Sequence, residues 1–371
     1  MRLLCLLVLA AACGDGSPAN PDATATADAT GSGGGSGSGE VDISFGTAGT
    51  AMLTGTCQAL AVDASDRPLV VTIDGPGHPT LTRLDSAGHV DATFTPRALG
   101  TDAIVFARVF ALASGKVLVT TFPMPGTTAH VYRFAVDGTP DLDLEMPSAL
   151  SAILVAAERT DGGIDLVGGG NDADHAFSFA RITAAGAVDT TFGVQVPATP
   201  MIPPGYFAHG VSLGGGTFAL SGASFTANNG PVTAHLLLAS DGAITKTTTI
   251  DDTQMLDLAR NGDKLYALAT SYPDEKGSIT RFDAMLTADP SFTSAESATI
   301  MPYPGIRNGS ALAVAPDGSL IVSDGKTLAR FHADGTTRST LPYMFEACGV
   351  AFDTHDRPLV ASATSVMRLV Q

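Results

Sequence analysis

The sequence predicts an all-β fold, because one unit recurs seven times from about residue 59 to the C-terminus, with a period of about 50 residues. The first half of each unit reads as two apolar strands joined by a tight polar turn, as in residues 59–63, 66–68 and 69–71. The second half reads as a strand that ends in an arginine, then a turn and a short outer strand, as in residues 83–94. Four short strands per repeat are typical of the blades of a β-propeller. Each blade needs neighbours to bury its faces, so we expect a closed seven-bladed ring over residues 41–371.

Tight turns mark the first hairpin of each unit. They fall at residues 65–67, 114–116, 161–163, 214–216, 261–263, 317–319 and 355–357. Gly, Asn and Asp dominate them because tight hairpin turns need residues that tolerate positive φ.

An arginine closes the third strand in six of the seven units. These arginines are Arg83, Arg133, Arg181, Arg281, Arg330 and Arg368, and the fourth unit has Leu237 in their place. A binding site occupies one place on a ring, whereas a brace recurs in every blade. We therefore interpret these arginines as structural braces.

The last unit stops before its outer strand. The missing piece occurs near the other end of the repeat region, where residues 39–46 match residues 88–94 and 186–193. We expect residues 41–46 to form an N-terminal strand that completes the last blade and closes the ring.

Segments of the form Gly-x-Val-Asp-x-Thr-Phe-Gly follow the arginine-led turns, and they resemble the delta-60, NHL-related propeller repeats of bacterial secreted and surface proteins. The resemblance covers about residues 41–371, is clear in the first and third units and at residues 39–46, and is degraded at residues 289–292. It implies a propeller, often at a cell surface, and no particular chemistry. WD-type repeats fit less well because the chain contains no Trp.

The N-terminus has the pattern of a bacterial lipoprotein. Residues 1–12 read as a signal peptide, with Arg2 before an apolar run that is too short to span a bilayer. The run ends in Leu-Ala-Ala-Ala-Cys, which resembles a lipobox except that Ala10 stands where Leu is usual. The resemblance implies lipidation of Cys13; the alternative is an ordinary signal peptide with an accidental cysteine. Residues 13–40 then form the lipidated Cys and a disordered Gly/Ser/Ala/Asp tether, which predicts a protein lipid-anchored in the bacterial cell envelope, at the outer membrane or cell surface.

Two further cysteines precede innermost strands. Cys57 lies in the first unit and Cys348 in the last, and these units are neighbours only if the ring closes. In an oxidising compartment we expect them to form a disulfide. The alternative is two buried free thiols.

Composition and motifs limit the function. A net charge of −17 repels phosphates, so nucleic acid is not an expected partner. Zinc-protease, Walker, CxxC and EF-hand spacings are missing, so we assign no catalytic residue, metal ligand or cofactor. Calcium is possible at the acidic residues 141–145 and 172–174, because calcium prefers several oxygen ligands.

Long, individual loops are expected on one face of the ring, and the blade connections there carry aromatic residues. Tyr206, Tyr303, Tyr343 and Phe345 are the candidate binding residues, because Tyr is common on recognition surfaces. The inner strands read as largely apolar, which favours a binding or scaffold module over an enzyme. Its partner would be an envelope protein or a glycan. The alternative is a metal-dependent, lactonase-like propeller hydrolase or lyase, which needs polar residues pointing into the channel.

Overall fold

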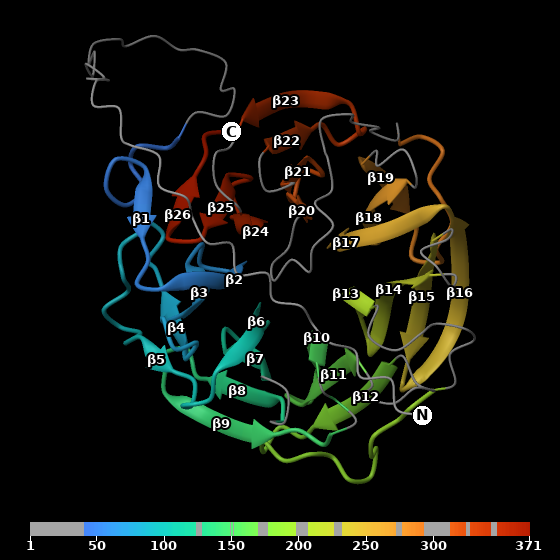
Figure 1. The fold of residues 1–371 in the computed structure, drawn as a ribbon, viewed down its shortest axis with the longest axis horizontal. Coiled ribbons are helices and arrows are strands. Elements are labelled where there is room, and N and C mark those ends of the chain that lie inside the picture. The colour runs from blue at the N-terminus through green and yellow to red at the C-terminus, as the bar shows by residue number, and fades with distance from the viewer. Residues whose placement is uncertain are drawn as a thin grey trace, which may run out of the picture. The chain divides into compact units, whose positions relative to one another are not determined.

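The computed structural model describes residues 41–123, 128–148, 150, 152–169, 177–197, 207–225, 232–271, 277–292, 312–323, 327–342 and 347–371. The chain divides into a unit of Met1–Ser36 and a unit of Gly37–Gln371, and the description below concerns the second. Its described elements are all β-strands, arranged as seven antiparallel sheets around a common centre (Figure 1). The prediction of a seven-bladed β-propeller is confirmed.

Each sheet is one blade, and its strands run in chain order from the centre outward, except that β1 is the outer strand of the seventh blade. The first blade contains β2 (Thr56–Val62), β3 (Pro68–Ile73), β4 (Pro79–Arg83) and β5 (Arg97–Ala98), and the second β6 (Ile104–Ala111), β7 (Val117–Pro123), β8 (His130–Phe134) and β9 (Pro140–Glu145). The third contains β10 (Ala152–Glu158), β11 (Ile164–Gly169) and β12 (Phe177–Ile182), and the fourth β13 (Phe207–Gly214), β14 (Thr217–Phe225), β15 (Val232–Ser240) and β16 (Ala243–Asp251). The fifth contains β17 (Thr253–Asn261), β18 (Lys264–Ser271) and β19 (Gly277–Phe282), and the sixth β20 (Leu312–Val314), β21 (Leu320–Ser323), β22 (Thr327–Phe331) and β23 (Thr337–Pro342). The seventh contains β24 (Ala347–Phe352), β25 (Pro358–Ser362) and β26 (Ser365–Arg368), with β1 (Thr50–Met52) as its outer strand.

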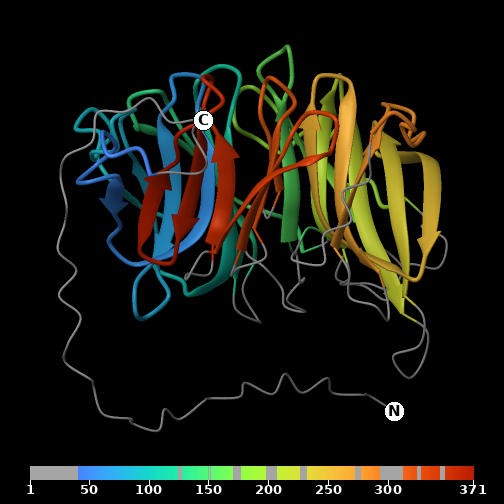
Figure 2. The same ribbon diagram turned by 90° about the horizontal axis from the view of Figure 1, so that it is seen from above.

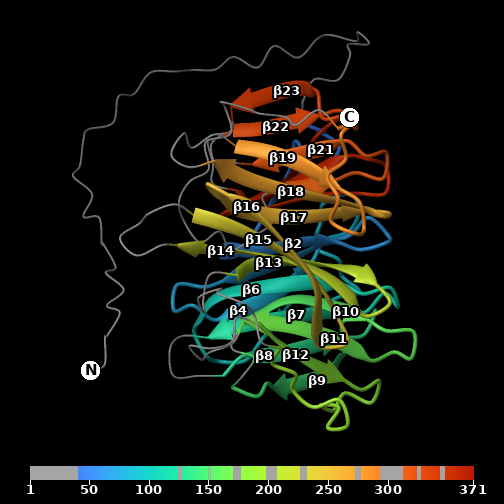
Figure 3. The same ribbon diagram turned by 90° about the vertical axis from the view of Figure 1, so that its right-hand side faces the viewer.

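The second strand of each blade is buried on both of its faces. In β3, for example, the five residues from Pro68 to Thr72 are all buried. Neighbouring blades supply the cover: one apolar cluster joins Leu69 and Val71 of the first blade to Val117 and Val119 of the second. The strands cross the thickness of the ring, as the edge-on views show (Figure 2, Figure 3). The continuous apolar runs in the sequence therefore correspond to strands packed between two neighbours.

The repeated arginines act as braces within their own blades. Arg83 donates from Nε to Asp91 at 2.8 Å, and its guanidinium lies 4.4 Å from the centre of the Phe94 ring. The same stacking on a Phe recurs for Arg181, Arg281 and Arg368. For Arg83, Arg281 and Arg368 the Asp and Phe of the repeated segment are thus both partners of the arginine, whereas Arg181 stacks on Phe192 and pairs with Asp165. A carboxylate neutralises the guanidinium and an aromatic face attracts it.

The braces also join each blade to the next. Five arginines donate to a backbone carbonyl of the following blade, at 2.6 to 3.3 Å: Arg83 to Val136, Arg133 to Ala184, Arg281 to Ala333, Arg330 to Val370 and Arg368 to Ser86. Arg181 reaches the side chain of Asp241 instead. In the fourth blade, which has Leu237 at the arginine position, Lys246 on the outer strand donates to the carbonyl of Met285 in the fifth blade. Every blade is therefore linked to its successor, including the one that lacks the arginine.

The N-terminal segment closes the ring, as predicted, but the pairing strand lies later than residues 41–46. Val41 makes a single bridge to Leu369, and the extended pairing with β26 is formed by β1. The chain turns immediately after Val41 because the Asp42 side chain accepts hydrogen bonds from the backbone and hydroxyl of Ser44. The corresponding segment of the first blade makes the same single bridge, between Leu84 and Val90, and its outer strand β5 also follows later. The repeated motif is thus a bridge and a turn rather than the outer strand itself.

The Cys57–Cys348 disulfide is present, with a Cα–Cα distance of 5.9 Å. It joins the innermost strands of the first and last blades, β2 and β24. The closure of the ring brings these two strands side by side, which confirms the predicted pairing.

Candidate functional site in the central channel

The innermost strands of the seven blades surround a cavity of about 370 Å³ at the centre of the ring. Its walls are contributed by β2, β6, β10, β13, β17, β20 and β24, and most of the lining side chains are apolar. Three lining residues carry ionisable groups: Arg108, His209 and Asp257. Among the described lining residues, these three carry the charged or titratable groups, and Ser212 adds a hydroxyl.

A β-bulge near the start of the innermost strand helps to position two of them. The register shifts between Phe207 and His209 in β13, and between Met255 and Asp257 in β17. Equivalent shifts occur in β2, β6, β10 and β24. A bulge places an extra residue in one strand and redirects the side chains beside it. His209 and Asp257 are the residues that directly follow their bulges.

His209 and Asp257 form a buried pair across two neighbouring blades. His209 Nδ1 lies 2.9 Å from Asp257 Oδ1, and the residues are only 6% and 3% exposed. The N–H direction does not meet hydrogen-bond geometry, since Nδ1 has no hydrogen-bond partner among the described residues. The contact turns the other ring nitrogen, Nε2, away from Asp257.

The carboxylate of Asp257 is also held by the backbone. Oδ1 accepts the Leu258 N–H at 2.8 Å, and Oδ2 accepts the Leu312 N–H of the sixth blade at 2.9 Å. Hydrogen bonds from backbone amides stabilise an ionised carboxylate in a buried position. Asp257 therefore links the fourth, fifth and sixth blades at the channel wall.

Arg108 approaches from the second blade. It lies on β6, four residues after Ile104, and its side chain is partly buried along the channel. Burial lowers the pKa of Arg108, and the negative charge of Asp257 opposes that effect. A guanidinium remains protonated in proteins even so, so the channel holds a fixed positive charge.

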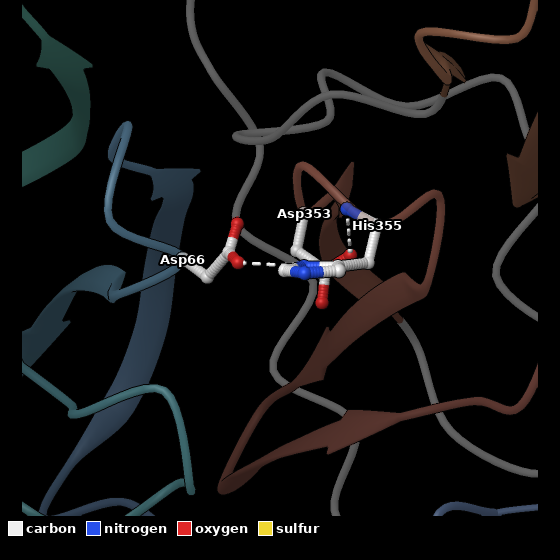
Figure 4. A group of neighbouring side chains, drawn as sticks. All are labelled: Asp66, Asp353 and His355. Carbon is white, nitrogen blue, oxygen red and sulfur yellow. Dashed lines mark hydrogen bonds and ion pairs between the residues drawn. The ribbon is translucent and has the colours of Figure 1, made fainter.

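A second polar cluster lies at the junction of the first and last blades, outside the channel. Asp66, Asp353 and His355 bring potential metal-ligand atoms within 4.8 Å of one another. Figure 4 shows Asp66 on the turn of the first blade facing His355 on the turn of the last. Asp66 accepts hydrogen bonds from Thr354 N at 2.7 Å and Thr354 Oγ1 at 3.0 Å, and contacts His355 Nδ1 at 2.9 Å.

The carboxylates of this cluster are already used by protein donors. Asp353 Oδ1 accepts the backbone N–H groups of His355 and Arg357, and Oδ2 pairs with Arg357 Nε at 2.7 Å. Burial by itself raises the pKa of Asp66, but the bonds from Thr354 and His355 outweigh it and lower the pKa. We interpret the cluster as a polar staple between the two blades that meet at the ring closure.

The remaining residues predicted from the sequence either lie outside the described residues or have protein partners. Cys13, Tyr206, Tyr303, Tyr343 and Phe345 lie outside the described residues, as do residues 172–174. On β9, Asp141 pairs with Arg133 and Lys116, at 2.8 and 2.7 Å, and Glu145 accepts the hydroxyl of Thr128. These two acids of residues 141–145 therefore have protein partners, and calcium binding remains a prediction.

Sequence reasoning missed the polar residues of the channel. Arg108, His209 and Asp257 each interrupt an innermost strand that otherwise reads as apolar, and the expectation of largely apolar inner strands passed over them. Their departure from the repeat pattern was the available signal, since each is present in one blade only.

The comparisons with known proteins agree on architecture. No family model and no curated protein matches the chain. Among solved structures, a hydrazine synthase of Kuenenia stuttgartiensis matches with a TM-score of 0.57 and 10% identity, over 86% of this chain and 96% of that one. A streptogramin B lyase matches with a TM-score of 0.53 and 9% identity, over 85% and 93%. The WD40 domain of Neurospora crassa Pan2 matches with a TM-score of 0.53 and 13% identity, over 85% and 90%. At these identities the similarity shows the propeller fold alone.

The disulfide indicates an oxidising, non-cytoplasmic compartment, because structural disulfides are rare in reducing ones. Within the described residues, no helix is long and apolar enough to cross a membrane.

Proposed function

We propose that this chain is a binding module, held outside the cytoplasm by a lipid on Cys13 and presented on the tether of residues 13–40. The resemblance of its repeats to those of bacterial secreted and surface proteins supports the location, and so does the disulfide. Its partners are an envelope protein or a glycan, contacted by the face that carries the long loops.

The observation that carries a binding role over catalysis is the state of Asp257. It is the carboxylate on the channel wall, and it is occupied by two backbone amides and by His209. A general base must reach a substrate proton, and a catalytic metal needs several free ligands around one point. Asp257 offers neither in this arrangement.

A metal-dependent hydrolase or lyase is the weaker candidate. The similarity in fold to a streptogramin B lyase favours it. Among the described residues, however, the group of three possible ligands is the Asp66 cluster, which lies outside the channel and has its own protein partners. Metal analysis of the purified protein separates the two: a stoichiometric ion would support the hydrolase or lyase.

The experiment for the binding role uses the loop tyrosines. Replacing Tyr206, Tyr303 and Tyr343 together by Ala should weaken capture of envelope proteins or glycans by about 2 kcal/mol or more, because Tyr side chains dominate many binding hot spots. The matched control replaces the same residues by Phe, which keeps most of the apolar area. A large fall in melting temperature with capture intact would instead assign these tyrosines to packing between blades.

A further inference from the structure

We propose that Asn261 is a site of spontaneous deamidation, and that the contact between the fifth and sixth blades controls the reaction. The Asn261 side chain has to leave the sixth blade before it can react, and the product cannot restore the contact. This modification site is independent of the binding role proposed above, so either proposal can fail while the other holds.

Asn261 precedes Gly262 in the first hairpin turn of the fifth blade. It pairs with Lys264 across the turn formed by Gly262 and Asp263, which are both exposed. Gly262 has a φ of +60°, and a side-chain carbon placed on it would meet open space. No described residue accepts a hydrogen bond from the Gly262 N–H. The described residues therefore leave the nitrogen that follows Asn261 uncovered.

The reaction is intramolecular. The backbone nitrogen of Gly262 attacks Cγ of Asn261, the Cγ–Nδ2 bond breaks, and ammonia leaves with the proton that the Gly262 nitrogen loses. Water then opens the resulting succinimide ring at one of its two C–N bonds, which gives aspartate or isoaspartate. Nothing is oxidised or reduced, and water is the co-reactant. Glycine has no side chain to hinder the approach, and Asn is one of the thermolabile residue types.

The side chain of Asn261 is held on the neighbouring blade. Its Nδ2 donates to the carbonyls of Ala315 and Pro316 in the sixth blade, at 2.9 and 3.1 Å. Because Nδ2 is the leaving group and Cγ has to turn toward Gly262, both hydrogen bonds must break before the ring can form. Local opening of a contact costs less free energy than global unfolding. We therefore expect the folded chain to react through opening of this junction.

The product cannot rebuild the contact. The side chain of aspartate or isoaspartate has no N–H group, and its carboxylate would face the two carbonyl oxygens that Nδ2 had bonded. Isoaspartate also adds a methylene to the backbone at the end of β17. The arginine link from Arg281 to Ala333 remains at the same junction. Each deamidated chain therefore keeps a weakened junction between the fifth and sixth blades.

The test is peptide mapping by mass spectrometry of the purified full chain, kept folded or in urea in mildly alkaline buffer. Residue 261 should gain one mass unit in both samples, and faster in urea. Arg281→Met removes the arginine link at this junction, and it should speed the reaction of the folded chain by about fivefold. Arg83→Met is the matched control, because Arg83 makes the corresponding contacts between the first and second blades. It should leave the rate unchanged.

Two outcomes would overturn the proposal. One is no mass gain at residue 261 of the folded chain during the time in which the urea sample reacts completely. The other is equal acceleration by Arg83→Met and Arg281→Met, because the reaction would then require global unfolding. If Arg281→Met does not fold, Arg281→Lys replaces it.

A further pair of variants tests the effect of the product. Asn261→Asp places the product's carboxylate in the turn and should lower the melting temperature by about 2 °C or more. Gln371→Glu adds the same negative charge at an exposed residue, and it should melt as the parent does. Equal melting temperatures for the two variants would contradict the loss of the contact.

Discussion

Arg368 and Asp42 are 326 residues apart in the chain, and their side chains meet at 2.8 Å. Arg368 also donates to the carbonyl of Ser86 in the first blade and lies over the ring of Phe45. One buried side chain therefore holds the N-terminal segment, the last strand and the first blade together. The ring closure depends on this contact as well as on strand pairing.

Replacing Asp42 by Ala should lower the free energy of unfolding by about 2–3 kcal/mol, because it leaves the buried Arg368 guanidinium without its carboxylate. Chemical denaturation followed by circular dichroism measures the change. Asp102→Ala is the control, because Asp102 is exposed and its replacement removes the same negative charge. Equal stability of the two variants would show that the ion pair contributes little.

Deleting residues 37–52 should expose the edge of β26 and promote aggregation, because this segment contains β1 and the Val41 bridge. Light scattering and the melting temperature report the effect. A deletion of residues 14–36, which belong to the separate N-terminal unit, should change neither. A monomeric protein that melts at the parental temperature after loss of residues 37–52 would contradict closure by strand pairing.

Reducing the Cys57–Cys348 disulfide should destabilise the protein. The bond has a sequence separation of 291 residues, and the loop-entropy model assigns about 5 kcal/mol to such a constraint on the unfolded chain. The expected result is a lower melting temperature in dithiothreitol. The double variant Cys57→Ser, Cys348→Ser should melt low with or without the reductant. Peptide mapping without reduction should recover the two cysteines as one linked species.

Acid should lower the stability of the propeller by protonating the aspartates of the repeated segments. Hydrogen bonds from Ser291 and then the charge of Arg281 lower the pKa of Asp289 to about 2, and the pKa values of Asp42, Asp91 and Asp189 are also lowered. A carboxyl group with a depressed folded-state pKa stabilises the fold above its unfolded pKa of about 4, and this contribution is lost as the pH falls toward the folded value. Melting temperatures should therefore drop between about pH 4 and pH 2.

The variant that isolates this effect is Asp289→Asn, whose melting temperature should fall less steeply over the same pH range. Asp263→Asn, an exposed residue of the same blade, should follow the parent curve. Parallel curves for all three proteins would assign the acid sensitivity to other groups.

Lipidation of Cys13 has a direct readout. Mass spectrometry of the membrane-extracted protein should show an acylated cysteine as the first residue, and Cys13→Ala should move the protein to the soluble fraction. An unmodified N-terminus beyond residue 13 in soluble protein would exclude the anchor.

Much of the fold was predictable because it repeats. The apolar strands, the glycine-rich turns and the arginines recur at a constant period, and each copy reinforces the interpretation of the others. The disulfide partners could be inferred for the same reason, because closure makes the first and last blades neighbours. The outer strand of the last blade was placed too early, since the side chain of Asp42 turns the chain at a point where the apolar pattern continues.

The channel residues could not be inferred in this way. Arg108, His209 and Asp257 occur once each, lie 149 residues apart at the extremes, and come together only because bulges and a closed ring place three different strands around one cavity. Sequence periodicity identifies the residues that all blades share, whereas these channel residues are each found in a single blade.

The links from each blade to the next have a consequence for engineering. They run in one direction around the ring. The link from Arg368 to Ser86 connects the last blade to the first. Val41 is bridged to Leu369, so a short linker could join the two ends of the propeller. New termini opened in the turn at residues 261–263 would leave the arginine links and the Lys246 link in place. The molecule should therefore tolerate circular permutation, with the polypeptide starting in a blade of the designer's choice.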